Sequence, residues 1–310
     1  MIEYFCTDEQ HSLRKLDKEE PGCWIAVFEP TPDELSQISS KFGFEEEDAT
    51  AALDLEEVSR IENEHGYTMF ILDTPVRDRS SNERSYKTIP IALFETPHNV
   101  VTICSVYKIP IIDQLKASKD LSSTEDVHAF AADILMASSS AYFMALRIIN
   151  RRRAELMATA KRPSRKELQD LYVLDSSLVY FKTSLVTNDA IFEKHLRRSP
   201  FPTEDDRARF DDVVIENRQA LETTRIYSEI LDSTINHFSL LMGHDLNRTM
   251  QVVATVSLVL CIPTAVAGFF GMNLLGIPLD EYPWGFSVVT GCTVFVSLAL
   301  LLVLKKLRWF

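Results

Sequence analysis

The sequence is poor in the residues that mark several common classes of protein. Its 310 residues contain five cysteines, an odd number, and these are widely spaced and never form a CxxC pair. This pattern argues against a disulfide framework and a zinc knuckle, and it suits a reducing cytosol. The first ten residues, MIEYFCTDEQ, lack the basic and apolar regions of a signal peptide. We therefore expect the N-terminal part to stay in the cytosol.

Basic residues are also in short supply. The chain has 32 Lys and Arg against 45 Asp and Glu, a formal net charge of -13, which argues against nucleic-acid binding. Acidity suits a protein that handles cations, although it commonly serves solubility alone. No GxxxxGK[ST] loop is present, and the apolar stretches hold no cluster of acid, base and nucleophile. Neither an ATP-driven pump nor an enzyme is indicated.

The N-terminal part, residues 1–122, is predicted to be a cytosolic α/β domain with a largely antiparallel or mixed sheet. A helix is expected to start at Thr31, with Pro32 in its first position and two acidic residues in its first turn. A second, acidic helix is expected over 45–61. The strand candidates are 2–5, 23–28, 67–72, 89–94 and 100–104.

Long helices are predicted after residue 122. Residues 123–200 form an expected antiparallel helix pair, broken at the basic segment 161–166. A stalk helix over 203–270 then starts at Thr203 as N-cap and continues without a loop into an apolar stretch. Its apolar positions recur at spacings near multiples of three and a half, so one stripe is expected to be buried: Phe210, Val214, Leu221, Leu231, Phe238 and Leu241.

Two uncharged stretches, 251–270 and 286–304, are each long enough to cross about 30 Å of hydrocarbon. The loop between them, 271–285, carries two acidic residues and no Lys or Arg. The tail 305–310 is basic, so the positive-inside rule places the loop outside and both termini in the cytosol. The sequence thus predicts a multi-pass protein of the inner or cell membrane. The charged residues behind this orientation are Asp280, Glu281, Lys305, Lys306 and Arg308.

One face of the first span is small and polar. Two helices per chain cannot enclose a water-filled path, so transport would require several copies around an axis. Spacing alone supports a pore lining and a helix-packing seam equally well. Pro263 within the span permits a bend. The face, found by alternating steps of three and four residues, comprises Asn247, Met250, Ala254, Ser257, Cys261, Thr264 and Gly268.

The tripeptide Gly271, Met272 and Asn273 directly follows the first span. A carboxamide oxygen is a hard, neutral donor, and a ring of such groups could hold a hydrated divalent ion without trapping it. Gly271 allows the backbone to turn where a Cβ would clash. By itself the tripeptide is a weak motif, but its place directly after one span and before a second makes it a specific candidate for the outer mouth of an ion path.

The sequence resembles the CorA family of divalent-cation (magnesium) transporters over essentially its whole length. In the cytosolic part, Pro32-x-Glu34-Leu35 and Phe42-Gly43-Phe44 are similar to the family pattern. The membrane part carries Asn247-Arg248-x-Met250, Pro263, Ala267-Gly268, Phe270-Gly271-Met272-Asn273, Trp284-Gly285-Phe286 and Lys305-Lys306.

This resemblance implies a funnel-shaped homopentamer whose first span lines a pore, with Asn273 as the outer selectivity ring and Thr264, Cys261, Met250 and Asn247 further in. It implies passive Mg2+ uptake, with Co2+ or Ni2+ as further substrates and no cofactor beyond the metal. It also implies closure when cytosolic Mg2+ binds acidic sites between subunits. Asp211 and Asp212 would form half of such a site, although ordinary helix charge explains them equally well.

Three departures leave the transported metal open. Phe270 stands where the family usually has tyrosine, and the basic segment 161–166 differs from the acidic helix pair of a magnesium branch. The run Leu275-Gly276-Ile277-Pro278 resembles the zinc-transporting ZntB branch. A Zn2+ transporter of the ZntB kind, either passive or proton-coupled, is therefore the first alternative. A membrane-anchored sensor or scaffold that conducts no ions is the second.

Overall fold

The computed structural model describes residues 1–78, 85–107, 109–118, 121–159, 164–272, 279 and 282–307. The chain divides into two compact units. The first comprises Met1–Lys161 and Arg165–Ile235, and the second comprises Arg162–Ser164 and Asn236–Phe310. Helix α6 (Glu204–Phe270) contributes residues to both units.

The first unit contains a mixed sheet of seven strands in the order β2-β1-β3-β7-β6-β5-β4. Strands β3 and β7 pair in parallel and the other neighbours are antiparallel, which confirms the predicted sheet type. The two strands that were not predicted, β2 and β4, lie at the sheet edges and are polar, LRKL and RIENE. The strands are β1 (Ile2–Thr7), β2 (Leu13–Leu16), β3 (Trp24–Phe28), β4 (Arg60–Glu64), β5 (Tyr67–Asp78), β6 (Ser85–Glu95) and β7 (Val100–Cys104).

Both faces of the sheet are covered. Successive side chains of a strand point to opposite faces, so Trp24 and Phe28 join the core under α3 (Pro110–Ala117) and α4 (Val127–Thr159). Ile25 and Val27 join the core under α1 (Pro32–Phe42) and α2 (Glu46–Ala51). This two-sided burial explains why the central strands β3 and β7 are buried at every residue and carry only one polar side chain, Thr102.

Helix α1 starts as predicted. The Thr31 hydroxyl accepts a hydrogen bond from the Glu34 N–H at 3.3 Å, and Glu34 accepts one from the Thr31 N–H at 2.9 Å. This reciprocal pair satisfies two N–H groups that the helix leaves free. Pro32 occupies the first turn, and the helix ends at Gly43 with a φ of 73°.

The expected helix over 45–61 is wrong in its second half. Helix α2 ends at Ala51, turns follow, and Arg60 begins strand β4. The backbone groups of β4 pair with the antiparallel strand β5. These hydrogen bonds to a distant strand favour a strand here, and they cannot be predicted from the local acidic sequence. The Asp48 carboxylate of α2 accepts a 2.6 Å hydrogen bond from the Tyr67 hydroxyl of β5 and so fixes the short helix on the sheet.

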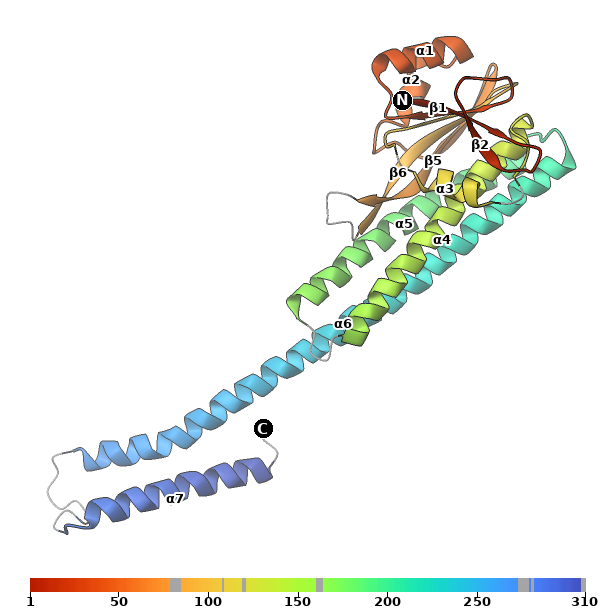
Figure 1. The fold of residues 1–310 in the computed structure, drawn as a ribbon. Coiled ribbons are helices and arrows are strands. Elements are labelled where there is room, and N and C mark those ends of the chain that lie inside the picture. The colour runs from red at the N-terminus through yellow and green to blue at the C-terminus, as the bar shows by residue number, and fades with distance from the viewer. Residues whose placement is uncertain are drawn as a thin grey trace. The chain divides into compact units, whose positions relative to one another are not determined.

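Three long helices complete the first unit. Helices α4 and α5 (Arg165–Arg198) run side by side in opposite directions (Figure 1). Of the basic segment 161–166 between them, residues 161–163 lie outside the described part of the chain. Thr203 caps α6 as predicted, since its hydroxyl accepts from the Asp206 N–H at 3.1 Å. The predicted stripe of α6 is buried at five of its six positions, and Leu241 is only half-buried. The buried members are Phe210, Val214, Leu221, Leu231 and Phe238.

The second unit consists mainly of the end of α6 and helix α7 (Gly285–Lys306), which contains the expected second span 286–304. The start of α7 tolerates no side chain at Gly285. A Cβ there would lie 2.2 Å from the carbonyl oxygen of Leu279, far inside van der Waals contact.

Candidate functional site

Three described helices are long and apolar enough to cross a membrane: Val127–Ala158, Glu204–Phe270 and Gly285–Lys306. The three helices differ in how much of their apolar surface is buried. In α4, 72% of the most apolar 18-residue window is buried, whereas in α6 and α7 the share is 6% each. The apolar residues of α4 are thus used in the core of the first unit. The apolar ends of α6 and α7 keep their surfaces available to lipid or to other chains.

The predicted polar face of α6 is exposed along its whole length. Met250 is 64% exposed, and every other residue of this face is also exposed. The Thr264 hydroxyl donates a 2.9 Å hydrogen bond to the carbonyl oxygen of Leu260, which leaves its oxygen able to accept from a hydrated ion. The exposed members are Asn247, Met250, Ala254, Ser257, Cys261, Thr264 and Gly268.

The opposite side of α6 faces α7. At about 100° per residue, Thr255, Val259 and Val266 lie roughly half a turn from the polar face. Thr255 is only 4% exposed. Between the helices is an apolar groove of about 720 Å³, lined on α6 by Val259, Leu260, Pro263, Val266, Ala267 and Phe270. One side of α6 therefore lies toward α7, and the polar side of α6 points away from α7.

The tripeptide after α6 is described only in part. The Gly271 N–H donates to the Ala267 carbonyl oxygen at 2.9 Å, which continues the helical pattern. A Cβ on Gly271 would lie 3.0 Å from that same oxygen, so a side chain would be crowded there. Met272 is exposed. Asn273 lies outside the described residues, as do Asp280 and Glu281 of the loop.

The candidate regulatory residues Asp211 and Asp212 lie near the start of α6 and are exposed. Among the described residues of the single chain, no group of three or more His, Cys, Asp and Glu side chains could hold a metal ion. Mg2+ takes six oxygen ligands, counting water. A site at this pair would therefore need ligands from water or from a second copy.

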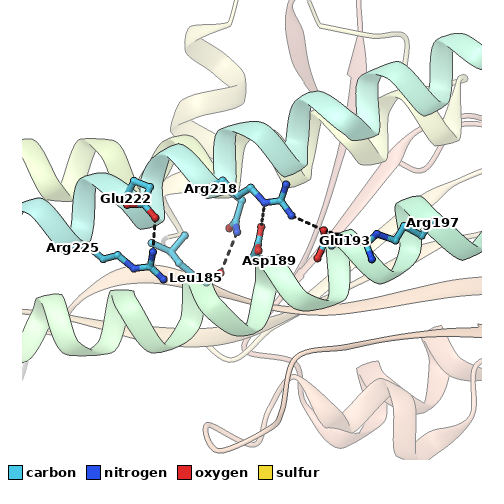
Figure 2. A network of polar contacts seen from close by, with 8 residues as sticks. Leu185, Asp189, Glu193, Arg197, Arg218, Glu222 and Arg225 are labelled. Atoms are coloured by element: carbon cyan, nitrogen blue, oxygen red, sulfur yellow. Dashed lines mark hydrogen bonds and ion pairs between the residues drawn. The ribbon is translucent and has the colours of Figure 1, made fainter.

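Further along the same helix, a network of ion pairs ties α6 to α5. Figure 2 shows Arg218 of α6 between two carboxylates of α5, with Asp189 at 3.0 Å and Glu193 at 2.9 Å. Arg197 also pairs with Glu193, and the hydrogen bond from Arg218 lowers the pKa of Glu193. The network is exposed, so it fixes the register of the two helices more than it adds stability.

The sequence did not predict a cluster of titratable side chains at the start of α4 and the end of α5. His128 in the first turn of α4 contacts Glu95 at the end of β6, with Nδ1 and Oε2 3.2 Å apart. His195 in the last turn of α5 lies among the rings of Phe70, Phe201 and Phe210. Burial lowers the pKa of His195 to about 4. No spacing in the sequence points to this cluster, because its members come from separate elements.

A model of the family described as CorA-like Mg2+ transporter protein matches residues 19–306 of the chain. The chain therefore belongs to the CorA family. This match confirms the resemblance that the sequence showed. Members of the family are divalent-cation transporters and not enzymes.

Individual relatives agree with this assignment. The cobalt/magnesium transport protein CorA of Methanocaldococcus jannaschii is 23% identical over 292 residues, which cover 92% of this chain and 90% of the relative. The complete structure of the CorA magnesium transporter from that organism has a TM-score of 0.81 at 22% identity and covers 100% of this chain and 99% of its own, which shows the shared fold. The zinc transport protein ZntB of Yersinia pestis is 28% identical over 119 residues, 36% of this chain and 34% of that protein.

Proposed function

We propose that this CorA-type transporter is a passive Mg2+ channel, with Co2+ and Ni2+ as further substrates, built from five copies around a pore. The single observation that supports it is the arrangement of α6. Its small, polar face is exposed in the chain, while its opposite face lies against α7. Polar side chains facing lipid are costly. Copies that turn these faces toward a common axis would replace the lipid with water and ions.

The filter in this proposal is Gly271, Met272 and Asn273, and the conduit below it is formed by Thr264, Cys261, Ser257, Met250 and Asn247, with Gly268 near the outer end. Neutral oxygen donors hold a hydrated divalent ion weakly enough to release it. A membrane potential of about 100 mV supplies about 2.3 kcal/mol per elementary charge, hence about 4.6 kcal/mol for a divalent ion. That drive supports uptake without ATP.

The orientation follows the basic residues. Lys305 and Lys306 form the last turn of α7, whereas the aromatic pair Tyr282 and Trp284, with ring centroids 5.0 Å apart, precedes its start. Aromatic rings favour the interface and basic residues favour the cytosolic side. We place the loop 271–285 outside and both termini in the cytosol.

Gating belongs to the proposal as well. Cytosolic Mg2+ bound at Asp211 and Asp212 together with ligands of a neighbouring copy would hold the funnel closed. Because both carboxylates are exposed, a neighbour can reach them. Replacing both with Asn should raise Mg2+ flux at millimolar cytosolic Mg2+ and leave flux at zero cytosolic Mg2+ unchanged.

The second candidate is a Zn2+ transporter of the ZntB type. It is favoured by the run Gly276-Ile277-Pro278 and by the ZntB relatives that the chain matches over 119 residues. Competition of Mg2+, Zn2+, Co2+ and Ni2+ for flux into proteoliposomes decides between the two. Inhibition of Mg2+ flux by Co2+ and Ni2+ supports the first, and Zn2+ flux that is unaffected by Mg2+ supports the second.

Two native cysteines test the pore directly. Cys261 lies on the polar face of α6 and Cys292 on α7, and both are exposed in the single chain. A charged, water-soluble thiol reagent should block Mg2+ flux through the wild type and through Cys292→Ser, but not through Cys261→Ser. Equal block of both variants would refute the assignment of this face to a pore. Absence of Mg2+ flux through the wild type and both variants would instead favour the membrane-anchored scaffold.

A further inference from the structure

The end of α6 and helix α7 form the walls of the apolar groove of about 720 Å³ in the second unit. The α6 wall runs from Val259 to Phe270, and the α7 wall runs from Gly285 to Leu301. No charged side chain is among the described residues that line the groove. Leu260 and Phe286 line it and remain 59% and 83% exposed, so the groove is open to the surrounding medium.

Two hydroxyl groups in this groove are bonded within their own helix. The Thr293 hydroxyl donates a 2.7 Å hydrogen bond to the Val289 carbonyl oxygen, and the Ser297 hydroxyl donates a 2.9 Å bond to the Thr293 carbonyl oxygen. Neither group needs an outside partner. A water molecule in a cavity needs about two to four polar partners, and these walls are mostly apolar. An apolar occupant therefore suits the groove better than water.

The groove lies on the side of α6 that faces away from the polar face. Pro263 lines the groove, and at about 100° per residue it lies roughly 160° around the helix from Cys261 of the polar face. In the assembly proposed above, the polar faces turn toward a common axis. The groove then faces outward, where lipid surrounds the protein.

The groove has about the depth of one lipid leaflet. Along α6 it extends over about 16 Å at 1.5 Å per residue, close to half of the roughly 30 Å of hydrocarbon in a bilayer. Tyr282 lines its end at the loop, and the ring centroids of Tyr282 and Trp284 are 5.0 Å apart. Aromatic rings of this kind favour the membrane interface. A smaller hollow of about 290 Å³ begins at Val259 and Leu260, where the groove ends on α6. The groove thus reaches from the interface at the loop to the middle of the bilayer.

The volume of the groove decides between two apolar occupants. A helix of a second copy, about 10–12 Å wide and as long as the walls, about 16–24 Å, would occupy about 1,300–2,700 Å³, far more than 720 Å³. An extended hydrocarbon chain of the same length, with carbon atoms in contact at about 4 Å, would occupy about 250–400 Å³. The groove therefore has room for an acyl chain and not for a helix.

We propose that the groove between α6 and α7 binds an acyl chain of a phospholipid from the leaflet on the side of the loop. The headgroup lies at the level of Tyr282 and Trp284, and the chain extends past Pro263 and Thr293 toward Leu301. The site rests on the two membrane spans of the proposed function, and it does not depend on ion conduction. A bound chain fills the space between α6 and α7 and leaves the polar face of α6 free.

Photolabelling of the full-length protein in dodecyl maltoside micelles tests the site. The probe is a phosphatidylcholine with a diazirine midway along one acyl chain, added in increasing amounts at constant detergent, and the labelled residues are identified by mass spectrometry. Labelling of Val266, Val289 and Thr293 should saturate near one lipid per chain, because the groove has room for an acyl chain of one lipid. Phe295 is 72% exposed and lies roughly 160° around α7 from Thr293. Its labelling should rise in proportion to the added lipid.

Matched variants identify the groove. Thr290→Phe adds a ring inside the groove and should lower the saturable labelling by about tenfold or more, because the ring takes the space of buried methylene groups. Ala267→Phe fills the groove from α6 and should have the same effect. Val288→Phe adds the same ring roughly 160° around α7 from Thr290, outside the groove, and should label like the wild type.

The wild type alone can overturn the proposal. Groove labelling that never saturates and is no stronger than that of Phe295 would show only ordinary contact with lipid. Labelling of Phe295 without labelling of the groove would show that a second copy covers it. Unchanged saturable labelling in both Thr290→Phe and Ala267→Phe would also overturn the site. Absence of label from both faces of α7 would refute the membrane spans as well, whereas saturable labelling in a protein without Mg2+ flux would support the site and refute the channel alone.

Discussion

His195 should make the first unit lose stability as the pH falls from neutral. Its Nδ1 lies 2.8 Å from the Ser199 hydroxyl, and its ring centroid is 5.1 Å from that of Phe70 and 4.8 Å from that of Phe210. Burial among these rings disfavours the imidazolium, and the charge of His128 adds to the effect. Together they lower the pKa of His195 from 6.5 to about 4.

The magnitude follows from the two pKa values. Above pH 6.5 both the folded and the unfolded states are neutral at His195, and its contribution to stability is complete. As the pH falls, the unfolded state takes up the proton first, so stability is lost until the folded state is protonated near pH 4. At 1.36 kcal/mol per unit, the total loss is about 3 kcal/mol, of which about 2 kcal/mol falls between pH 7.5 and 5.

The assay compares urea unfolding of the wild type and His195→Asn in nanodiscs at several pH values and constant ionic strength. Asn keeps a hydrogen-bonding group near the position of Nδ1 and removes the titration. Emission from Trp24, which is fully buried in the sheet core, reports on the first unit when Trp284 and Trp309 are replaced with Phe.

The difference between the two pH profiles isolates His195 from other titrating groups, including His128, whose effect has the opposite sign. The wild type should lose about 2 kcal/mol more than His195→Asn between pH 7.5 and 5. Parallel profiles within about 0.5 kcal/mol would refute the reasoning. His65→Asn removes an exposed histidine and should leave the wild-type profile unchanged.

Three further predictions concern the helices. Gly285→Ala should lower the Tm of the nanodisc-embedded protein, at a cost of about 1–3 kcal/mol, because the new methyl group meets the Leu279 carbonyl oxygen; an unchanged Tm would contradict that close approach. Arg218→Met should cost at most about 1 kcal/mol in urea unfolding, since its pairs with Asp189 and a neighbouring carboxylate are exposed. Thr264→Val should reduce Mg2+ flux by about fivefold in proteoliposomes, corresponding to one lost hydrogen bond to a hydrated ion; full flux would argue against its place in the conduit.

The sequence predicted the features that follow from local chemistry. The caps at Thr31 and Thr203 could be recognised because Ser, Thr or Asp before acidic residues satisfies free N–H groups in any context. The buried stripe of α6 could be recognised because the helical period alone decides which residues share a face. The same period selected the exposed polar face from Asn247 to Gly268.

Features that depend on distant partners could not be predicted. Strand β4 is polar, and only its pairing with β5 makes it a strand in place of the expected helix. Glu95 and His128 lie in different elements, and each resembles an ordinary exposed charge in the sequence. His195 is one residue among several charges at the end of α5, and only the fold brings three aromatic rings around it.

Apolar composition alone does not decide which helices enter a membrane in this chain. Helix α4 passes the same criteria of length and apolarity as α6 and α7, yet 72% of its apolar window is already buried, against 6% in each of the others. A helix whose apolar face is used in a protein core has no reason to enter lipid, because the same surface cannot be buried twice. The apolar surface at the end of α6 and along α7 is still exposed in the single chain. Since α6 also exposes the polar residues Asn247, Ser257 and Thr264, lipid alone would leave them without hydrogen-bond partners. The assembly of several copies that we propose would cover this polar face, while the opposite face of α6 lies toward α7.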